Sequence, residues 1–289
     1  MTWVNAVVQG LLLGGVYALF ACGLSLVFGV LRIVNLAHGA LTVLAAYLAL
    51  LVVAATGVHP LVSLVVVVPV MAALGYLLQR TVLYRSLGSG ELAPLVVTFG
   101  LAIVLQNVLQ QAFSADTRTL PAGDLGRSGL ALGPSLTIGW LGLATLVVAV
   151  AVLAGLEVLL ARTATGRALR ATSDDPETAQ LMGLDDRRVY AVATAIAFAT
   201  IALAAVFYGM RGTFSPAQGP ELLIFAFEAV IIGGLGSLRG TLAGGLLLGV
   251  AQAVGAQVDP SYGVLAGHLL FLVVLAVRPA GLVRQEATR

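Results

Sequence analysis

Long uncharged runs, separated by short polar stretches, are the dominant pattern of the chain. They cover 1–31, 33–79, 92–115, 128–156, 189–210, 240–258 and 260–277. A membrane-spanning helix needs about 20 mostly apolar residues, because each residue advances about 1.5 Å across a hydrocarbon layer about 30 Å thick. Several runs reach that length, and 33–79 is long enough for two passes with a break near 57–60. The pattern predicts a polytopic membrane protein.

The runs contain eight or nine hydrophobic segments, which we predict to form one all-α transmembrane bundle. The segments are roughly 4–29, 38–55, 60–79, 92–113, 136–160, 189–209, 222–235, 241–257 and 262–278. Segment 222–235 is short, so it is expected to be re-entrant or to join its neighbour, and 222–257 crosses once or twice. Spanning strands would require apolar and polar residues in alternation, and runs such as 61–78 show none. No linker divides 1–289, which is predicted to be a single domain.

The composition agrees with a membrane-embedded chain. Hydrophobic residues make up 60% of the sequence and charged residues 10%, whereas soluble domains average about 25% charged residues. The only cysteine, Cys22, lies inside the first uncharged run, so the sequence holds no disulfide framework. That run has no positively charged start and is too long for a signal peptide, so we expect a retained first helix.

A polar island at 162–188 interrupts the apolar pattern. It holds ten of the 28 charged residues (15 basic plus 13 acidic), five of them arginines and five acidic. Its centre predicts a short helix that is capped by Ser173 or Asp174 and has Pro176 in its first turn. Gly183 is a natural left-handed stop for this helix. A capped, rigid helix at the membrane surface would give a partner protein a place to dock.

The positions of the arginines predict the orientation of the chain, because cytoplasmic loops carry an excess of positive charge. All fifteen basic residues are arginines. With 162–188 in the cytoplasm, Arg32, the loop 79–91 and the C-terminal tail fall on the same side, and the N-terminus lies outside. The side of Arg239 depends on how 222–257 is threaded. The arginines left on the outer side are Arg118, Arg127 and Arg211.

No catalytic or nucleotide-binding motif occurs in the sequence, so no enzyme activity is predicted. The three histidines, His38, His59 and His268, lie in different segments, and there is no HExxH pair, Cys/His metal spacing or GxSxG elbow. A GxxxxGK(S/T) loop is also missing. We therefore predict no metal and no cofactor, no nucleic acid partner, and a separate subunit for any ATP that drives transport.

Polar residues within the apolar runs are candidates for a translocation pathway. Asn35 and His38 lie between the first two segments and are predicted to form a turn at the cytoplasmic interface or a gate that lines the pathway. Gln106 and Gln110 share one helix face, where they are expected to pack against neighbouring helices or to line a water-filled pathway. A charge at the membrane centre costs at least about 2.5 kcal/mol. Glu228 is therefore expected to face the bundle interior, protonated or paired with an arginine, in a structural role or in contact with substrate.

Glycines are abundant, with 34 in the chain. Gly10–Gly14 and Gly245–Gly249 have the GxxxG spacing that lets helix backbones approach closely in lipid. The stretch 233–240 holds four glycines and predicts a non-helical turn, which is tolerated at membrane depth only inside protein or beside a cavity. Three glycines of this stretch join the pathway candidates: Gly233, Gly234 and Gly236.

Four stretches, in the right order, resemble the LivH-type permeases of high-affinity branched-chain amino acid ABC importers. They are Val16–Gly39, Thr165–Ala197, Ala226–Gly249 and Val277–Val283. The resemblance implies a bacterial inner-membrane importer with a second related permease subunit, two P-loop ATPase subunits in the cytoplasm and an extracytoplasmic binding protein. It also implies that the island inserts into a groove of the ATPase. The coupling residues would be Asp174, Asp175, Pro176, Glu177, Ala179, Leu181, Met182 and Gly183.

Two alternatives fit the same sequence. The superfamily also contains permeases for urea and short-chain amides, so the substrate is less well defined than the architecture. A stand-alone channel or secondary transporter would take up substrate without partners, and would show a clearer internal repeat with ionisable residues in both halves. Outside 128–161, where Glu157 lies near the cytoplasmic end, Glu228 is the only acidic residue deep in a run, which argues against a proton-coupled carrier.

Overall fold

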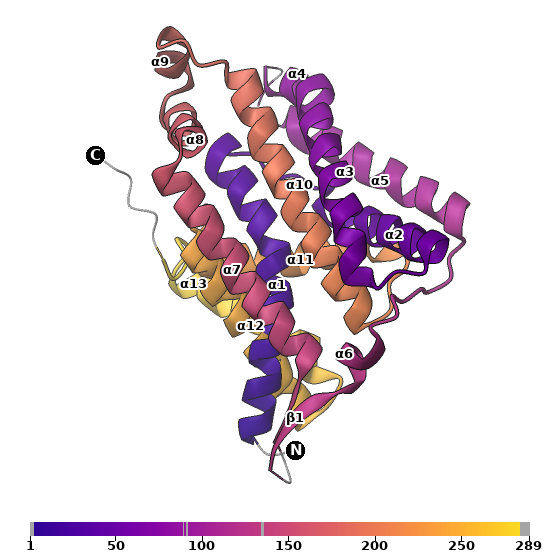
Figure 1. Cartoon of the computed structure of the whole chain (residues 1–289). Helices are drawn as coiled ribbons and strands as arrows, with labels where there is room; N and C mark the ends of the chain where they lie inside the picture. Colours follow the sequence, from indigo (N-terminus) through magenta and orange to yellow (C-terminus); the bar gives the residue numbers. More distant parts are fainter. Residues whose placement is uncertain (1–2, 89, 91, 134–135, 284–289) are drawn as a thin grey trace.

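The computed structural model describes residues 3–88, 90, 92–133 and 136–283, which fold into a helical bundle (Figure 1). Its long apolar helices are α1 (Trp3–Leu31), α2 (His38–Thr56), α3 (Pro60–Leu78), α5 (Ala93–Phe113), α7 (Trp140–Arg162), α10 (Asp186–Arg211), α11 (Gly219–Gly233), α12 (Leu238–Val258) and α13 (Tyr262–Val277). The described residues include eight helical stretches long and apolar enough to cross a membrane, and α13, with 16 residues, is shorter. The prediction of an all-α bundle is confirmed.

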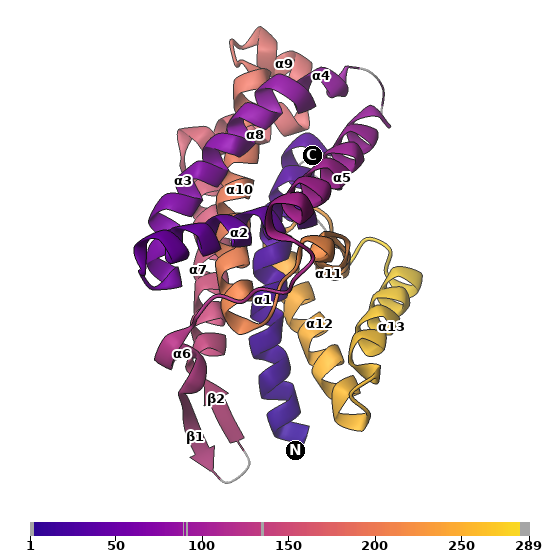
Figure 2. The same cartoon turned by 90° about the vertical axis from the view of Figure 1, so that its right-hand side faces the viewer.

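Shorter elements connect the long helices. They are η1 (Gln79–Leu83), α4 (Tyr84–Leu87), α6 (Gly123–Arg127), β1 (Gly129–Gly133), β2 (Leu136–Gly139), α8 (Ala164–Asp174), α9 (Pro176–Leu181) and η2 (Pro216–Gln218). In both views α4, α8 and α9 lie at one end, and β1 and β2 lie at the other end beside the start of α1 (Figures 1 and 2).

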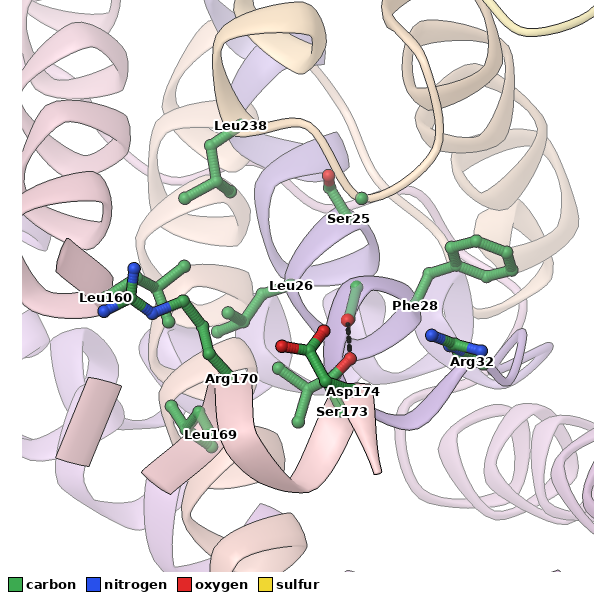
Figure 3. A pocket seen from close by; sticks show the side chains of 13 residues that line it. Ser25, Leu26, Phe28, Arg32, Leu160, Leu169, Arg170, Ser173, Asp174 and Leu238 are labelled. Atoms are coloured by element: carbon green, nitrogen blue, oxygen red, sulfur yellow. Dashed lines mark hydrogen bonds between the residues drawn. The ribbon is translucent and has the colours of Figure 1, made fainter. Parts of the chain in front are cut away.

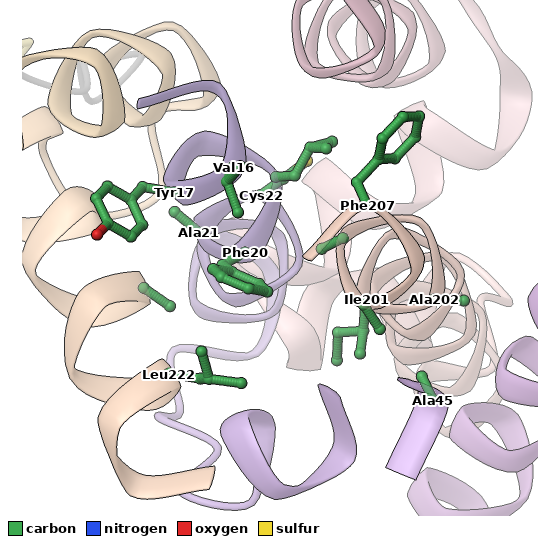
Figure 4. Close-up of a cluster of buried hydrophobic side chains, with 14 of the residues drawn as sticks. Val16, Tyr17, Phe20, Ala21, Cys22, Ala45, Ile201, Ala202, Phe207 and Leu222 are labelled. Atoms are coloured by element: carbon green, nitrogen blue, oxygen red, sulfur yellow. The ribbon is translucent and has the colours of Figure 1, made fainter. Parts of the chain in front are cut away.

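Helices α1 and α10 form the centre of the bundle and run in opposite directions (Figure 1). Helix α1 packs on α7, α10, α11 and α12, and α10 packs on α2 and α3. Between α1 and α10 the fully buried side chains of Phe20 and Ile201 belong to one large apolar cluster, to which Leu222 of α11 also contributes (Figure 4). The outer helices α3, α5, α7 and α13 instead expose many apolar side chains, as expected for faces that meet lipid or a neighbouring subunit.

The GxxxG pairs of α1 and α12 pack directly against each other. A Cβ added to Gly14 would lie 2.5 Å from the Cα of Leu246, and one added to Gly249 would lie 2.3 Å from the backbone nitrogen of Gly14. No side chain larger than hydrogen fits at these two positions without moving a backbone. The predicted close approach of glycine-bearing helices is therefore confirmed.

The path of 222–257 comprises two separate helices, α11 and α12, joined by a non-helical turn at 234–237. Gly234 and Gly236 have φ angles of +109° and +79°, which side-chain-bearing residues rarely adopt. The hydroxyl of Ser237 accepts a hydrogen bond from the backbone N–H of Gly240 at 3.1 Å and so caps α12. The predicted turn in 233–240 is therefore present, but it is shorter than predicted, because Gly233 ends α11 and Gly240 lies within α12.

The segment predicted at 136–160 starts too early, because 136–139 forms a strand. Strands β1 and β2 pair antiparallel, with Gly129 opposite Gly139 and Leu130 opposite Ile138. The run 128–156 is uncharged throughout, and an apolar run by itself does not distinguish a strand from a helix start. The hairpin was therefore missed, and α7 begins at Trp140.

Candidate functional site

Helices α8 and α9 project from one end of the bundle between α7 and α10 (Figure 1). The hydroxyl of Thr163 accepts a hydrogen bond from the backbone N–H of Gly166 at 3.0 Å, which caps α8. A Cβ added to Gly166 would lie 2.2 Å from the carbonyl oxygen of Leu159. Glycine at this position thus lets α8 fold tightly against the last turn of α7, and this contact fixes the position of the projecting segment.

Asp175 caps α9, and the predicted caps Ser173 and Asp174 are wrong, because both belong to the last turn of α8. The Asp175 carboxylate accepts hydrogen bonds from the backbone N–H of Glu177 at 3.1 Å and of Thr178 at 3.0 Å. The physical reason lies in Pro176, since a residue that precedes proline is pushed out of the helical region. The Thr178 hydroxyl also donates to this carboxylate, which lowers the pKa of Asp175 below its usual value.

Two large apolar side chains lie at the tip of α9 and face solvent. Leu181 is 88% exposed and Met182 is 80% exposed, whereas Ala179 is buried. Gly183 follows with a φ of +86° and ends the helix, as predicted, although α9 itself covers only Pro176–Leu181. The other predicted coupling residues, Asp174, Asp175, Pro176, Glu177 and Gly183, are exposed. Exposed apolar side chains on a polar protrusion are typical of a surface that a partner protein covers.

A hollow of about 810 Å³ lies beside α9, where the start of α10 faces α4. The Tyr84 hydroxyl donates to the carboxylate of Asp186 at 3.1 Å, and the guanidinium group of Arg187 lies 5.6 Å from the centre of the Tyr84 ring. Arg187 also donates to the carbonyl oxygen of Arg80 at 2.9 Å. These contacts hold η1 and α4, which continue α3, against the start of α10, so α9, α4 and the hollow form one polar face.

The segment with Asn35 and His38 folds back into the protein. Each side chain is only 2% exposed, and the His38 ring nitrogen Nε2 lies 2.7 Å from the carbonyl oxygen of Phe20. The Asn35 side chain accepts a hydrogen bond from the backbone N–H of Ala37 at 3.0 Å. The predicted turn before α2 is therefore present and packs within the bundle, and a role of its two side chains in gating the pathway stays a prediction.

Helices α2 and α11 meet at their first residues, a contact that the sequence analysis missed. A Cβ added to Gly39 would lie only 1.8 Å from the carbonyl oxygen of Gly219. Each helix follows a long central helix that ends in a similar string, VFGVLR at Val27–Arg32 and VFYGMR at Val206–Arg211. The shared string indicates that α2 and α11 occupy equivalent positions after two central helices that run in opposite directions (Figure 1). It is the sequence signal from which the contact between α2 and α11 could have been predicted.

Glu228 faces the bundle interior, as predicted, but its partner is a histidine and not an arginine. It is 3% exposed, and its Oε1 lies 2.5 Å from Nδ1 of His268 on α13. The second carboxylate oxygen, Oε2, is buried and lacks a hydrogen-bond partner within the part of the chain that the structure describes. The ring of Phe225 lies between those of Tyr17 and His268, with centroids 5.1 and 6.3 Å away. Polar and aromatic groups thus join α1, α11 and α13.

The remaining pathway candidates do not gather around Glu228. Gln106 is half-buried and Gln110 is exposed on α5, a helix that packs mainly on α2. A Cβ added to Gly233 would lie 2.1 Å from the carbonyl oxygen of Gly240, so Gly233 serves the packing of α11 on α12. The structure therefore distributes the predicted pathway residues over several places, and their role in translocation stays a prediction.

A second cavity, of about 690 Å³, opens between the end of α1, the end of α7, α8 and the turn at 234–237 (Figure 3). Gly236 is one of its lining residues. The Ser173 hydroxyl donates to the carbonyl oxygen of Gly29 at 2.7 Å and ties α8 to α1 at the cavity. Arg239 forms an ion pair with Glu157, so the turn lies at the same end of the bundle as α8.

The comparisons with known proteins agree with one another. Residues 6–277 match the model of the family described as branched-chain amino acid transport system / permease component. The chain is 34% identical to the high-affinity branched-chain amino acid transport system permease protein BraD of Pseudomonas aeruginosa, over 97% of this chain and 95% of that protein. It is 29% identical to LivH of Escherichia coli, over 95% and 93% of the two chains. The fructose import permease protein FrcC of Rhizobium meliloti is 30% identical over 76% of this chain and 63% of that protein.

Proposed function

Because this chain belongs to the branched-chain amino acid transport permease family, we propose that it carries branched-chain amino acids across the bacterial inner membrane with energy supplied by separate ATPase subunits. The chain is a multi-pass helical membrane protein and a permease component. The observation that supports separate ATPase subunits is the projecting α8–α9 segment, which carries two exposed apolar side chains at its tip. The sequence itself contains no nucleotide-binding loop.

The α9 tip is the docking point for an ATPase subunit in this proposal. Leu181 and Met182 would enter an apolar groove of the ATPase, and the acidic first turn of α9 would lie at the rim of the interface. Apolar side chains at the centre of a small interface contribute most when they become fully desolvated. The hollow between α9 and α4 widens the face that the ATPase covers.

Movement at α9 would reach the centre of the bundle through two rigid links. Four residues separate the end of α9 from the start of α10, which runs as one helix of 26 residues through the core. Helix α8 is tied to the end of α1 by the Ser173–Gly29 hydrogen bond. ATP binding would therefore shift α1 and α10 together, and transport requires that the partners bind the two resulting states with different affinity.

The placement of the arginines supports a cytoplasmic location of α8 and α9. Arg32, Arg80, Arg85 and Arg278 lie at or near the α8 end, and the ion pair with Glu157 adds Arg239 to them. Arg118, Arg127 and Arg211 lie toward the opposite end: Arg211 ends α10, Arg118 pairs with Phe214 just beyond it, and Arg127 ends α6 just before β1. An excess of arginine at one end is the charge bias of cytoplasmic loops, and the N-terminus would then lie outside.

The substrate assignment rests on the names of the relatives. BraD and LivH are named for branched-chain amino acids, whereas FrcC, which matches over a smaller share of its length, is named for fructose. In this proposal a second permease subunit completes the channel, and an extracytoplasmic binding protein delivers the amino acid and supplies most of the selectivity. The urea and amide alternatives gain no support from these names.

The docking proposal is tested by copurification of the ATPase with the permease from membranes. Leu181→Asp and Met182→Asp should reduce the amount of bound ATPase and the substrate-stimulated ATP hydrolysis, because each places a charge where the proposal requires a dry contact. Leu130→Asp, at an exposed apolar position in β1 at the opposite end of the bundle, is the matched control and should have no effect. Unchanged ATPase binding in both α9 variants would refute the docking proposal.

A further inference from the structure

The cavity beside α8 has the shape and the chemistry of a small-molecule site. It is an open cavity lined by four parts of the chain, the end of α1, the end of α7, α8 and the turn before α12 (Figure 3). Its volume of about 690 Å³ corresponds to roughly twenty water molecules at about 30 Å³ each. A free amino acid therefore fits with room for water. The apolar part of the lining is Leu26, Phe28, Val30, Leu160, Leu169 and Leu238.

Unlike charges line the cavity without neutralising one another. Arg32, Arg170 and Asp174 contribute two guanidinium groups and one carboxylate, and Figure 3 shows Asp174 between the two arginines. Within the described ranges, no ion pair joins Asp174 to either arginine, and Arg170 makes only a long hydrogen bond, 3.5 Å, to the carbonyl oxygen of Ala161. These charges are available to a ligand.

A further observation points to a ligand in this cavity. Ser25 is fully buried, lines the cavity, and its hydroxyl has no hydrogen-bond partner among the residues that the structure places. A buried hydroxyl without a partner destabilises a protein by about 1–3 kcal/mol, and a polar ligand atom would remove that penalty.

We propose that this cavity binds a free branched-chain amino acid from the cytoplasm and that its occupancy slows the importer. The proposal rests on the substrate class and orientation given under the proposed function. A guanidinium group of Arg32 or Arg170 pairs with the ligand carboxylate in the geometry that favours arginine. The Asp174 carboxylate pairs with the ligand ammonium group, and the leucine-rich wall receives the branched side chain. The carboxylate of Asp174 disfavours a phosphate or an anionic lipid headgroup at the same place.

The link to transport follows from the position of Asp174. It is the last residue of α8 and directly precedes Asp175, the cap of α9. A ligand held by Arg170 and Asp174 of α8 and in contact with the end of α1, where Ser25 and Arg32 line the cavity, would hold α8 and α1 together beside the existing Ser173–Gly29 hydrogen bond. The bound ligand would thereby restrain α8 and α9, which must move with the ATPase. Imported amino acid that accumulates in the cytoplasm would therefore slow further import.

The test uses the complete importer complex, purified without its binding protein, and radiolabelled leucine as the probe. Wild-type complex should bind leucine, and Arg170→Gln and Asp174→Asn should each weaken that binding by about tenfold, the loss expected for one charge-assisted hydrogen bond. Arg167→Gln is the matched control, since Arg167 is exposed on α8 but does not line the cavity. Leucinol lacks the carboxylate and 4-methylpentanoate lacks the amino group, so both should compete poorly.

In proteoliposomes with the ATPase side outward, added leucine should inhibit transport-coupled ATP hydrolysis, and Arg170→Gln should require about tenfold more leucine for the same inhibition. Equal leucine binding by wild type, Arg170→Gln and Asp174→Asn overturns the proposal, as does displacement of leucine by inorganic phosphate. A complex that imports leucine but binds none without the binding protein overturns this inference alone. A complex that imports no branched-chain amino acid overturns the proposed function, and this inference with it.

Discussion

Among the glycines that the structure describes, Gly39 leaves the least room for a side chain. Gly39→Ala would place a methyl group 1.8 Å from the carbonyl oxygen of Gly219, where only a backbone shift could make room. Overpacking of this kind typically costs about 1–3 kcal/mol, and more when only backbone can yield. We expect a lower midpoint of thermal unfolding in detergent and less folded protein in membranes.

Gly100→Ala is the control for the Gly39 variant. Gly100 also lies within a helix, α5, but a Cβ there would meet nothing within 4 Å. Alanine is favoured over glycine inside a helix by about 1 kcal/mol, so this variant should be neutral or slightly stabilising. A Gly39→Ala protein as stable as the Gly100→Ala protein would show that α2 and α11 do not meet as described.

The contact between Glu228 and His268 predicts that the effect of Glu228 on stability depends strongly on His268. His268→Ala would leave both carboxylate oxygens of a buried glutamate without partners, because Oε2 already lacks one in the described part of the chain. A buried polar group left unpaired costs about 1–3 kcal/mol. Glu228→Leu in the His268→Ala background should recover part of the lost stability, measured by thermal unfolding of the purified protein. Additive losses in the double variant would mean that the two side chains are not coupled.

At the scale of elements, α9 should respond to the chemistry of its cap. Asp175→Ala removes the acceptor for the backbone N–H groups of Glu177 and Thr178, so both amides should exchange with deuterium faster. Asn also caps helices well, so Asp175→Asn should retain most of the protection. Unchanged exchange in the alanine variant would contradict the assigned cap.

The pH dependence of the α9 cap follows from the direction of one pKa shift. The Thr178 hydroxyl lowers the pKa of Asp175 in the folded protein. The carboxylate's contribution to folding is therefore fully present above its unfolded pKa and is lost as the pH falls through the lower, folded pKa. Amide protection at Thr178, corrected for intrinsic exchange, should thus be constant near neutral pH and decrease only in acid. A decrease centred near neutral pH would be inconsistent with this assignment.

The helices themselves were largely predictable. The length of an uncharged run indicates whether it can span the membrane, and the position of a glycine indicates where a helix can end or turn. Positions 38, 60 and 262 begin helices where the sequence predicted them, and Gly183 ends α9. The cap of α9 is Asp175, and not Ser173 or Asp174, because Pro176 pushes the residue before it out of the helical region. The hairpin at 129–139 was missed because an apolar strand and a helix start have the same composition.

Contacts between distant segments were not predictable from the same patterns. The burial of Asn35 and His38 depends on the return of the chain along α1, and the pairing of Glu228 with His268 depends on α13 packing over α11. The cavity beside α8 combines residues separated by more than 200 positions, from Ser25 to Leu238. Hydrophobic periodicity indicates that a residue is inside, but it does not indicate which partner it meets.

The orientation of the whole molecule can be tested by single-cysteine labelling, because Cys22 is buried and the structure gives two exposed positions at opposite ends. In a Cys22→Ala background produced without the ATPase subunits, Met182→Cys at the α9 tip should react with a membrane-impermeant maleimide only after the cells are opened. Leu130→Cys in the β hairpin should react in intact cells. The two variants control for each other, since the proposed orientation requires opposite outcomes. Labelling of position 182 in intact cells would place α8 and α9 outside, where they could not meet an ATPase, and the arginine excess would then contradict the charge bias of cytoplasmic loops.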